Sequence, residues 1–229
     1  MKSFEELLAG SVAAHGHLCP GQVVGVRMAI LGLRLLNFSA PCTLPELKRL
    51  IVFVEMDRCT GDAVAHTTGV KLGRRSLKFV DYGIMAATFL DLATGKAFRV
   101  ISTEESRDLA TLYAPWETEK RRQQLQAYKV MPDAVMFCVQ KVKVDLTEFD
   151  LPGPTRRKVA CAGCGQMVRD NREVMREGRP YCRPCAQGAY FREAREIAWP
   201  DMQWSPYCQE IAGSAPGPDF LGVSAVRGR

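Results

Sequence analysis

Two pairs of cysteines constrain this chain more than any other feature of its sequence. Cys161 and Cys164 are separated by two residues, as are Cys182 and Cys185, and 17 residues lie between the pairs. Pairs at this spacing supply four thiolates to one tetrahedral zinc ion, and a unit this short needs such a cross-link because its apolar core is small. Four protein ligands leave no open position, so we expect a structural zinc. The alternative is four reduced cysteines in a small core.

The residues around these cysteines predict a separate C-terminal unit. We expect a knuckle at the first pair, a hairpin after it and a helix over 186–197 that follows the second pair, an arrangement that resembles a treble-clef finger. Pro152, Gly153 and Pro154 mark a polar linker over 151–158. The predicted domains are therefore a core at 1–150, a finger at 159–198 and an extended tail at 199–229.

The composition favours a globular protein that works inside the cell. The chain has 229 residues, 47% of them hydrophobic and 24% charged, and a formal net charge of +6. Its N-terminus lacks the layout of a secretory signal, and its longest apolar run is interrupted by Arg27 and Arg34. Nine cysteines, an odd number, indicate thiolates for metal or redox chemistry rather than disulfides. We expect a cytoplasmic protein without membrane contact.

Local patterns in the first 150 residues predict runs of strands and separate helices rather than a regular alternation. Ser3 and Glu6 form a capping box that starts a helix ending near Gly16, and the apolar residues over 22–36 predict a buried helix. We expect strands over 51–56, 77–80, 85–92, 98–102 and 134–144, and helices over 59–66, 104–113 and 116–128. The predicted fold class is α+β, with a mixed or antiparallel sheet.

Two of the three histidines and one cysteine lie within five positions near the N-terminus: His15, His17 and Cys19. Zinc and similar ions accept imidazole and thiolate together, and Cys19 would stand at the N-terminus of the next helix, which favours its thiolate. We predict that these side chains converge with Cys59, at the start of the helix over 59–66, on one metal site with an open position. Asp62 is expected nearby.

Each part of this prediction has a structural alternative. The loop with His15, His17 and Cys19 can be a sharp turn only, Cys59 a small buried apolar residue, and His66 is more often a structural histidine than a ligand. Cys19, Cys59 and His17 are also the candidate catalytic residues, with a thiolate as nucleophile and a histidine as proton carrier.

Two positively charged regions are candidates for anion binding. Lys71 and Arg74 lie in the turn around Gly69 and Gly73, where backbone amides and cations accept a phosphate or an oxyanion. Within 152–184, eight arginines and lysines outnumber three acidic residues. A basic surface of this kind fits nucleic acid or an acidic protein, and a solvated charged face is the simpler interpretation.

The opening motif resembles the His-x-His-x-Cys-Pro-Gly signature of the FmdE family, which takes its name from one of the subunits of tungsten formylmethanofuran dehydrogenase. Later blocks resemble the same family over roughly 12–145: Asp57-Arg58-Cys59, Asp62-Ala63, Thr68-Gly69, Leu72-Gly73 and Asp81-Tyr82-Gly83. His66 and Val70 depart from the pattern, because family members often have glutamine and cysteine there. The missing cysteine weakens a mechanism that pairs position 70 with Cys59 and leaves the predicted metal site intact.

The resemblance implies an α+β core that dimerises, with a zinc finger as an auxiliary unit. Formylmethanofuran dehydrogenase reduces carbon dioxide onto methanofuran in methanogenesis, but its pterin metal centre and iron–sulfur clusters belong to other subunits. This sequence has no repeated four-cysteine ferredoxin pattern and no Gly-rich dinucleotide loop. We therefore predict a homodimeric, metal-binding accessory protein of tungsten or molybdenum enzyme metabolism, with subunits of such enzymes as partners. The alternatives are an independent thiol- or zinc-dependent enzyme and a nucleic-acid-binding regulatory module.

Overall fold

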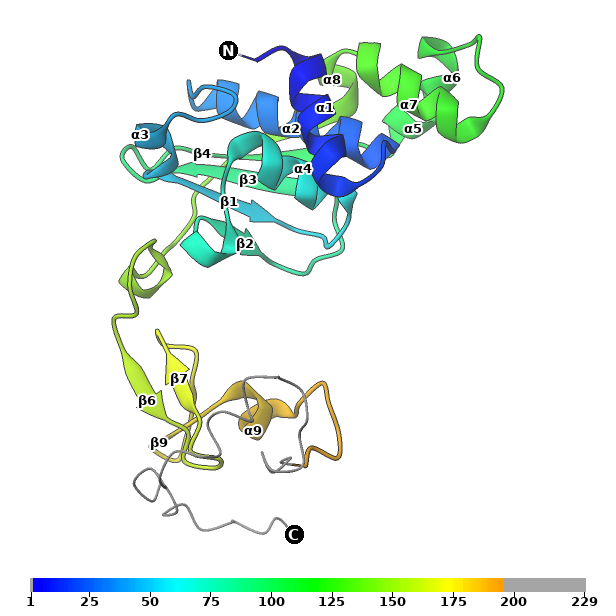
Figure 1. Cartoon of the computed structure of the whole chain (residues 1–229). Helices are drawn as coiled ribbons and strands as arrows, with labels where there is room; N and C mark the ends of the chain where they lie inside the picture. Colours follow the sequence, from blue (N-terminus) through cyan, green and yellow to red (C-terminus); the bar gives the residue numbers. More distant parts are fainter. Residues whose placement is uncertain (1, 196–229) are drawn as a thin grey trace, which may run out of the picture. The chain divides into compact units, whose positions relative to one another are not determined.

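The computed structural model describes residues 2–195 and divides the chain into two units, Met1–Pro154 and Thr155–Arg229 (Figure 1). The predicted tail at 199–229 lies outside the described residues. None of the helices within 2–195 is long and apolar enough to cross a membrane.

A five-stranded mixed sheet forms the framework of the first unit. Its order is β2-β1-β3-β4-β5, with β1 parallel to β2 and every other neighbouring pair antiparallel. The strands are β1 (Leu50–Val54), β2 (Leu77–Phe79), β3 (Ala86–Asp91), β4 (Ala97–Ser102) and β5 (Phe137–Val142). The predicted α+β class with a mixed sheet is therefore confirmed.

Three helices cover one face of this sheet: α1 (Phe4–His15), α2 (Pro20–Leu35) and α4 (Cys59–Thr68) (Figure 1). The capping box of Ser3 and Glu6 starts α1, and Gly16 ends it in the left-handed region at φ 95°. Helix α2 packs so closely on the sheet that a Cβ at Gly32 would lie 2.3 Å from the ring of Phe89. The two short elements on this part of the chain are α3 (Leu44–Leu47) and η1 (Leu72–Arg74).

The region between β4 and β5 differs from its prediction at three points. The helix expected over 104–113 is split into α5 (Glu105–Asp108) and α6 (Ala110–Tyr113). The helix expected from Trp116 is α7 (Lys120–Val130), because the carboxylate of Glu119 accepts the amides of Arg121 and Arg122 and caps it there. The strand expected from Ala134 begins at Phe137, after the turn of α8 (Asp133–Met136).

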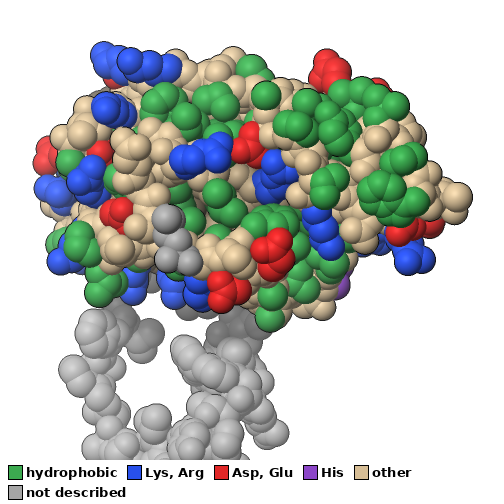
Figure 2. All heavy atoms as spheres, turned by 90° about the horizontal axis from the view of Figure 1, so that it is seen from above, with side chains coloured by type: hydrophobic (Ala, Val, Ile, Leu, Met, Phe, Trp, Pro, Cys, Tyr) green, Lys and Arg blue, Asp and Glu red, His purple; other side chains and the backbone are tan. Residues whose placement is uncertain are grey.

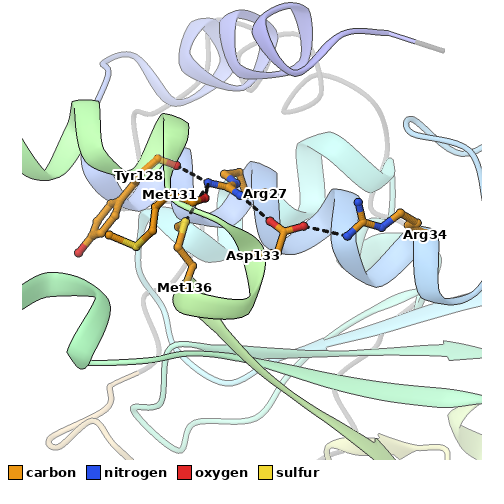
Figure 3. Close-up of polar contacts among 6 residues, drawn as sticks. All are labelled: Arg27, Arg34, Tyr128, Met131, Asp133 and Met136. Atoms are coloured by element: carbon orange, nitrogen blue, oxygen red, sulfur yellow. Dashed lines mark hydrogen bonds and ion pairs between the residues drawn. The ribbon is translucent and has the colours of Figure 1, made fainter. Parts of the chain in front are cut away.

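Arg27 of α2 holds α7 and α8 in place (Figure 3). Its guanidinium donates to the carbonyl oxygens of Tyr128, 2.8 Å away, and Met131, and it pairs with Asp133. The carbonyls at the end of α7 and the acidic start of α8 therefore share one cation. Figure 2 shows the helical side of this unit, where hydrophobic side chains gather over the α5–α7 end between scattered charges.

The second unit consists of two hairpins and a short helix. Strands β6 (Lys158–Ala160) and β7 (Met167–Arg169) form the first hairpin, and β8 (Val174–Arg176) and β9 (Arg179–Tyr181) form the second. Glu177 and Gly178 both have positive φ, as a two-residue hairpin turn requires. Helix α9 (Arg183–Gln187) starts before Cys185 and ends at Gly188, so the expected helix over 186–197 is wrong in its bounds. Its last residues, 196 and 197, lie outside the described residues.

Candidate metal centres

The four cysteines of the second unit form one compact cluster. Cys161 and Cys164 lie in the knuckle between β6 and β7, Cys182 precedes α9 and Cys185 lies within it. Their sulfur atoms all lie within 4.8 Å of one another, and those of Cys164 and Cys182 are 3.7 Å apart. A tetrahedron of sulfurs about 2.3 Å from a central zinc has edges of about 3.8 Å, so the cluster fits this ion.

Backbone amides prepare the cluster for negative charge. The amide of Cys182 donates to the Cys161 sulfur at 3.2 Å, and the amide of Gly163 donates to it at 3.4 Å. These bonds, that of Cys182 first, lower the pKa of the Cys161 thiol to about 6. A thiolate is the form that binds zinc, and four such ligands close its coordination sphere. The cluster is therefore a zinc-binding, structural centre of the predicted kind.

Several arginines of this unit serve its own structure. The guanidinium of Arg157 pairs with Glu173 and donates to Asn171 at 2.5 Å, and that of Arg176 donates to the carbonyl of Ala186. These contacts join the two hairpins and α9 without any nucleic acid. The predicted nucleic-acid surface remains an alternative on the charges that are left.

The histidine and cysteine motif of the first unit lies where α1 passes into α2. His15 is the last residue of α1, His17 lies exposed in the loop, and Cys19 is buried and caps α2. The ligand atoms of these three residues lie within 4.8 Å of one another, and the two imidazole rings are 4.7 Å apart between centroids. The loop therefore brings together the three donors that the sequence motif contains.

The imidazole of His15 is held from one side and has no partner on the other. Its Nδ1 lies 2.9 Å from a carboxylate oxygen of Asp62 on α4, whereas Nε2 is buried and has no hydrogen-bond partner within residues 2–195. Metal-bound histidines characteristically give their other ring nitrogen to a carboxylate, which fixes the ring. An orphaned ring nitrogen beside a second imidazole and a thiol fits a metal ion of the zinc type.

Close packing of α2 on α4 brings Cys59 to this motif. A Cβ added at Gly21 would lie 3.0 Å from the Cβ of Cys59, and one at Gly25 would lie 2.7 Å from a backbone oxygen of α4. Burial raises the pKa of the Cys59 thiol, and so does a hydrogen bond with the thiol of Cys19. Cys59 therefore neighbours the group of three donors through Cys19.

Sequence reasoning missed the residue that positions Cys59. Gln22 is fully buried, donates to the carbonyl oxygen of Cys59 at 2.7 Å and accepts a hydrogen bond from Ser11. It ties α1, α2 and α4 together directly behind the two thiols. The signal in the sequence was an amide side chain inside an otherwise apolar helix, since such a residue needs buried partners.

The remaining candidates lie apart from this motif. His66 is exposed on α4 and packs near Gly10 of α1. Lys71 and Arg74 are exposed on either side of η1, and Arg74 lines a different pocket together with Lys48. A groove of about 500 Å³ runs past His15, Cys59 and Asp62, and the residues of the predicted Lys71–Arg74 anion site do not line it.

Comparison with known proteins agrees with both units. The family model for "FmdE, Molybdenum formylmethanofuran dehydrogenase operon" matches residues 14–140, and that for "Prokaryotic dksA/traR C4-type zinc finger" matches residues 153–191. The crystal structure of an FmdE-like protein of tungsten formylmethanofuran dehydrogenase from Syntrophus aciditrophicus shares the fold. It aligns with a TM-score of 0.53 at 22% identity over 83% of this chain and 95% of that one.

A curated relative from Archaeoglobus fulgidus is named a probable S-adenosyl-L-methionine-binding protein. It is 31% identical over 100 residues, which are 44% of this chain and 27% of that protein, so the match spans about a quarter of the relative. The first unit carries the family's model over more than half of the chain, on the fold described above. The chain belongs to the FmdE family and ends in a C4-type zinc finger.

Proposed function

We propose that the first unit binds one divalent metal ion of the zinc type through His15, His17 and Cys19, with Cys59 as a further thiol ligand. The observation that carries this proposal is the state of His15. Its Nδ1 is taken by Asp62, while its buried Nε2 has no partner within residues 2–195 and belongs to a group of donors within 4.8 Å. A buried imidazole nitrogen left without a hydrogen bond costs free energy, which a bound metal would recover.

The residues of the chain divide this work among themselves. His15, His17 and Cys19 would hold the ion, Asp62 orients His15, and Gln22 fixes the backbone at Cys59. A metal in such a mixed site supplies Lewis acidity to whatever molecule enters its open position. Unlike the cysteine cluster of the finger, this site lies beside a groove that a small molecule can enter.

We propose further that the chain is a homodimeric accessory protein of molybdenum or tungsten enzyme metabolism. The support is the family to which it belongs, whose description names the molybdenum formylmethanofuran dehydrogenase operon. Static and dynamic light scattering at micromolar concentration tests the dimer. A mass near the 25.4 kDa of one chain would reject it.

An independent enzyme is the second candidate, and the groove beside His15 and Cys59 favours it. In this alternative the thiolate of Cys59 or Cys19 acts as nucleophile or metal ligand, and His17 carries protons. Carboxymethylation of the thiols in metal-free protein separates the two candidates. An enzyme of this type loses turnover of its substrate, whereas an accessory protein loses only metal binding.

Metal content per chain is the decisive measurement for the metal site. We expect about two metal ions per chain after loading with zinc, and about one in His17→Ala and Cys19→Ser, because only the finger then stays occupied. Asp62→Asn should keep the site but weaken its affinity for cobalt by about 10- to 100-fold, as loss of an orienting carboxylate does.

The matched control for this experiment is Asp57→Asn. Asp57 is also exposed and lines the same groove, but His15 pairs with Asp62 and not with it. Its affinity for cobalt should equal that of the wild type. One metal ion per chain in the wild type, unchanged in His17→Ala, would contradict the proposal.

A further inference from the structure

The groove beside the proposed metal site has a wall of apolar side chains that face solvent. Val54, Leu77 and Phe79 line it from the sheet side, and Leu72 lines it from η1. Leu72 is 64% exposed and Phe79 is 46% exposed. Its volume of about 500 Å³ lies within the range of small-molecule sites. Apolar side chains gathered in a concave surface lose unfavourable contact with water when an apolar ligand covers them.

The charged lip of the same groove favours a negative ligand group. Arg58 is exposed, lines the groove and forms no ion pair with any residue between 2 and 195. It precedes the ten-residue helix α4, whose first amides carry partial positive charge. Of the two carboxylates at this lip, that of Asp62 is engaged by His15. A cation without a partner in the described part of the chain, beside a helix N-terminus, is complementary to a carboxylate.

We propose that this groove binds a small organic carboxylate with an aromatic or branched apolar body. The carboxylate lies at the end formed by Arg58, His15 and Cys59, and the apolar body covers Leu72 and Phe79. The proposal rests on the proposed metal site for a second contact of the carboxylate, at the open position of the ion. The contacts with Arg58 and the apolar wall do not depend on the metal.

Three probe molecules test this ligand class by calorimetric titration of the zinc-loaded full chain. 3-Phenylpropanoate carries both features, acetate lacks the apolar body, and 3-phenylpropan-1-ol lacks the carboxylate. We expect 3-phenylpropanoate to bind at least about tenfold more tightly than either of the others, because both ends of the groove then contribute. Equal affinity for 3-phenylpropanoate and the alcohol would overturn the assignment of the anionic end.

Matched variants locate the binding in the groove. Leu72→Ser should weaken binding of 3-phenylpropanoate about fivefold, whereas Leu112→Ser, at a leucine that is 71% exposed on α6, should leave it unchanged. Arg58→Gln should weaken binding about tenfold and leave the affinity for acetate weak. Equal effects of Leu72→Ser and Leu112→Ser would overturn the proposal.

The metal content of the same samples separates the two proposals. Binding of 3-phenylpropanoate that depends on Leu72 in a protein with one metal ion per chain would refute the metal site and support the groove. Two metal ions per chain without binding of any probe would support the metal site and refute the groove.

Discussion

Arg27 shows how much of the first unit depends on a single side chain. It reaches from α2 to two carbonyl oxygens at the end of α7 and to Asp133 at the start of α8 (Figure 3). Its side chain is only 14% exposed, so water cannot replace these contacts if the cation is removed. The same carboxylate also pairs with Arg34, whose side chain is 64% exposed.

The two arginines therefore form a natural comparison. Arg27→Met should lower the free energy of unfolding by about 2–4 kcal/mol, because it leaves two carbonyls and a carboxylate without their buried donor. Arg34→Met should lower it by less than about 1 kcal/mol, since exposed ion pairs contribute little. Urea denaturation followed by circular dichroism measures both. Similar losses for the two variants would show that Arg27 does not hold α7 and α8.

At the scale of elements, the contact of α2 with α4 sets the position of the candidate site. Gly25 allows this contact, because a Cβ at this residue would lie 2.6 Å from that of Ala63 and 2.7 Å from the carbonyl oxygen of Thr60. Such distances require the two helices to move apart. The thiols of Cys19 and Cys59 lie at the N-terminal ends of these two helices and would separate with them.

Gly25→Ala is therefore expected to destabilise the first unit by about 2–3 kcal/mol in spite of the higher helix propensity of alanine. It should also weaken cobalt binding at the proposed core site. Gly10→Ala is the control, since its Cβ would meet only the end of the His66 side chain, at 2.9 Å, which can swing away. If urea midpoints rank the two variants as equal, close packing of α2 and α4 does not limit stability.

A second element-scale prediction concerns the hairpin between β3 and β4. Asp91 is buried at its base and accepts hydrogen bonds from Arg49 at 2.7 Å, from the hydroxyl of Thr94 and from the amide of Ala93. Burial alone would raise the pKa of this carboxyl, but these hydrogen bonds outweigh it and lower the pKa. The carboxylate therefore stabilises the fold above the unfolded-state pKa of about 3.9.

This stabilisation is lost as the pH falls from about 3.9 through the lower folded-state pKa. The difference in urea midpoint between the wild type and Asp91→Asn should thus be large at pH 6 and shrink towards pH 2.5. Every other carboxyl is common to both proteins, so the difference isolates Asp91. A difference that stays constant over this range would show that the charge of Asp91 does not contribute.

At the scale of the whole molecule, the two units should respond differently to metal removal. The finger has short strands and few buried residues besides its cysteines, whereas the first unit has an extensive apolar core. Chelation should therefore unfold residues 155–195 and leave the first unit folded. Amide signals in ¹H–¹⁵N spectra of the full chain distinguish the two units. Finger signals that persist without metal would contradict a structural zinc.

Several features of this protein follow from short stretches of sequence alone. Ser3 and Glu6 predict the start of α1, and the spacing of Cys161, Cys164, Cys182 and Cys185 predicts the zinc cluster. In each case the interacting groups are close along the chain or form a pattern with one chemical use, so local geometry determines the outcome. The starts of α7 and β5 were missed by three or four residues, because the Glu119 cap and the turn of α8 were not recognised.

Only the tertiary structure decided how the candidate core site is supported. The motif of His15, His17 and Cys19 is visible in the sequence, but the carboxylate that orients His15 comes from Asp62 on α4, and Gln22 on α2 holds the backbone at Cys59. These partners meet because Gly21 and Gly25 let two helices approach, which no local pattern reports. The motif therefore determined which donors are present, and helix packing determined which of their atoms remain without a partner in the described part of the chain.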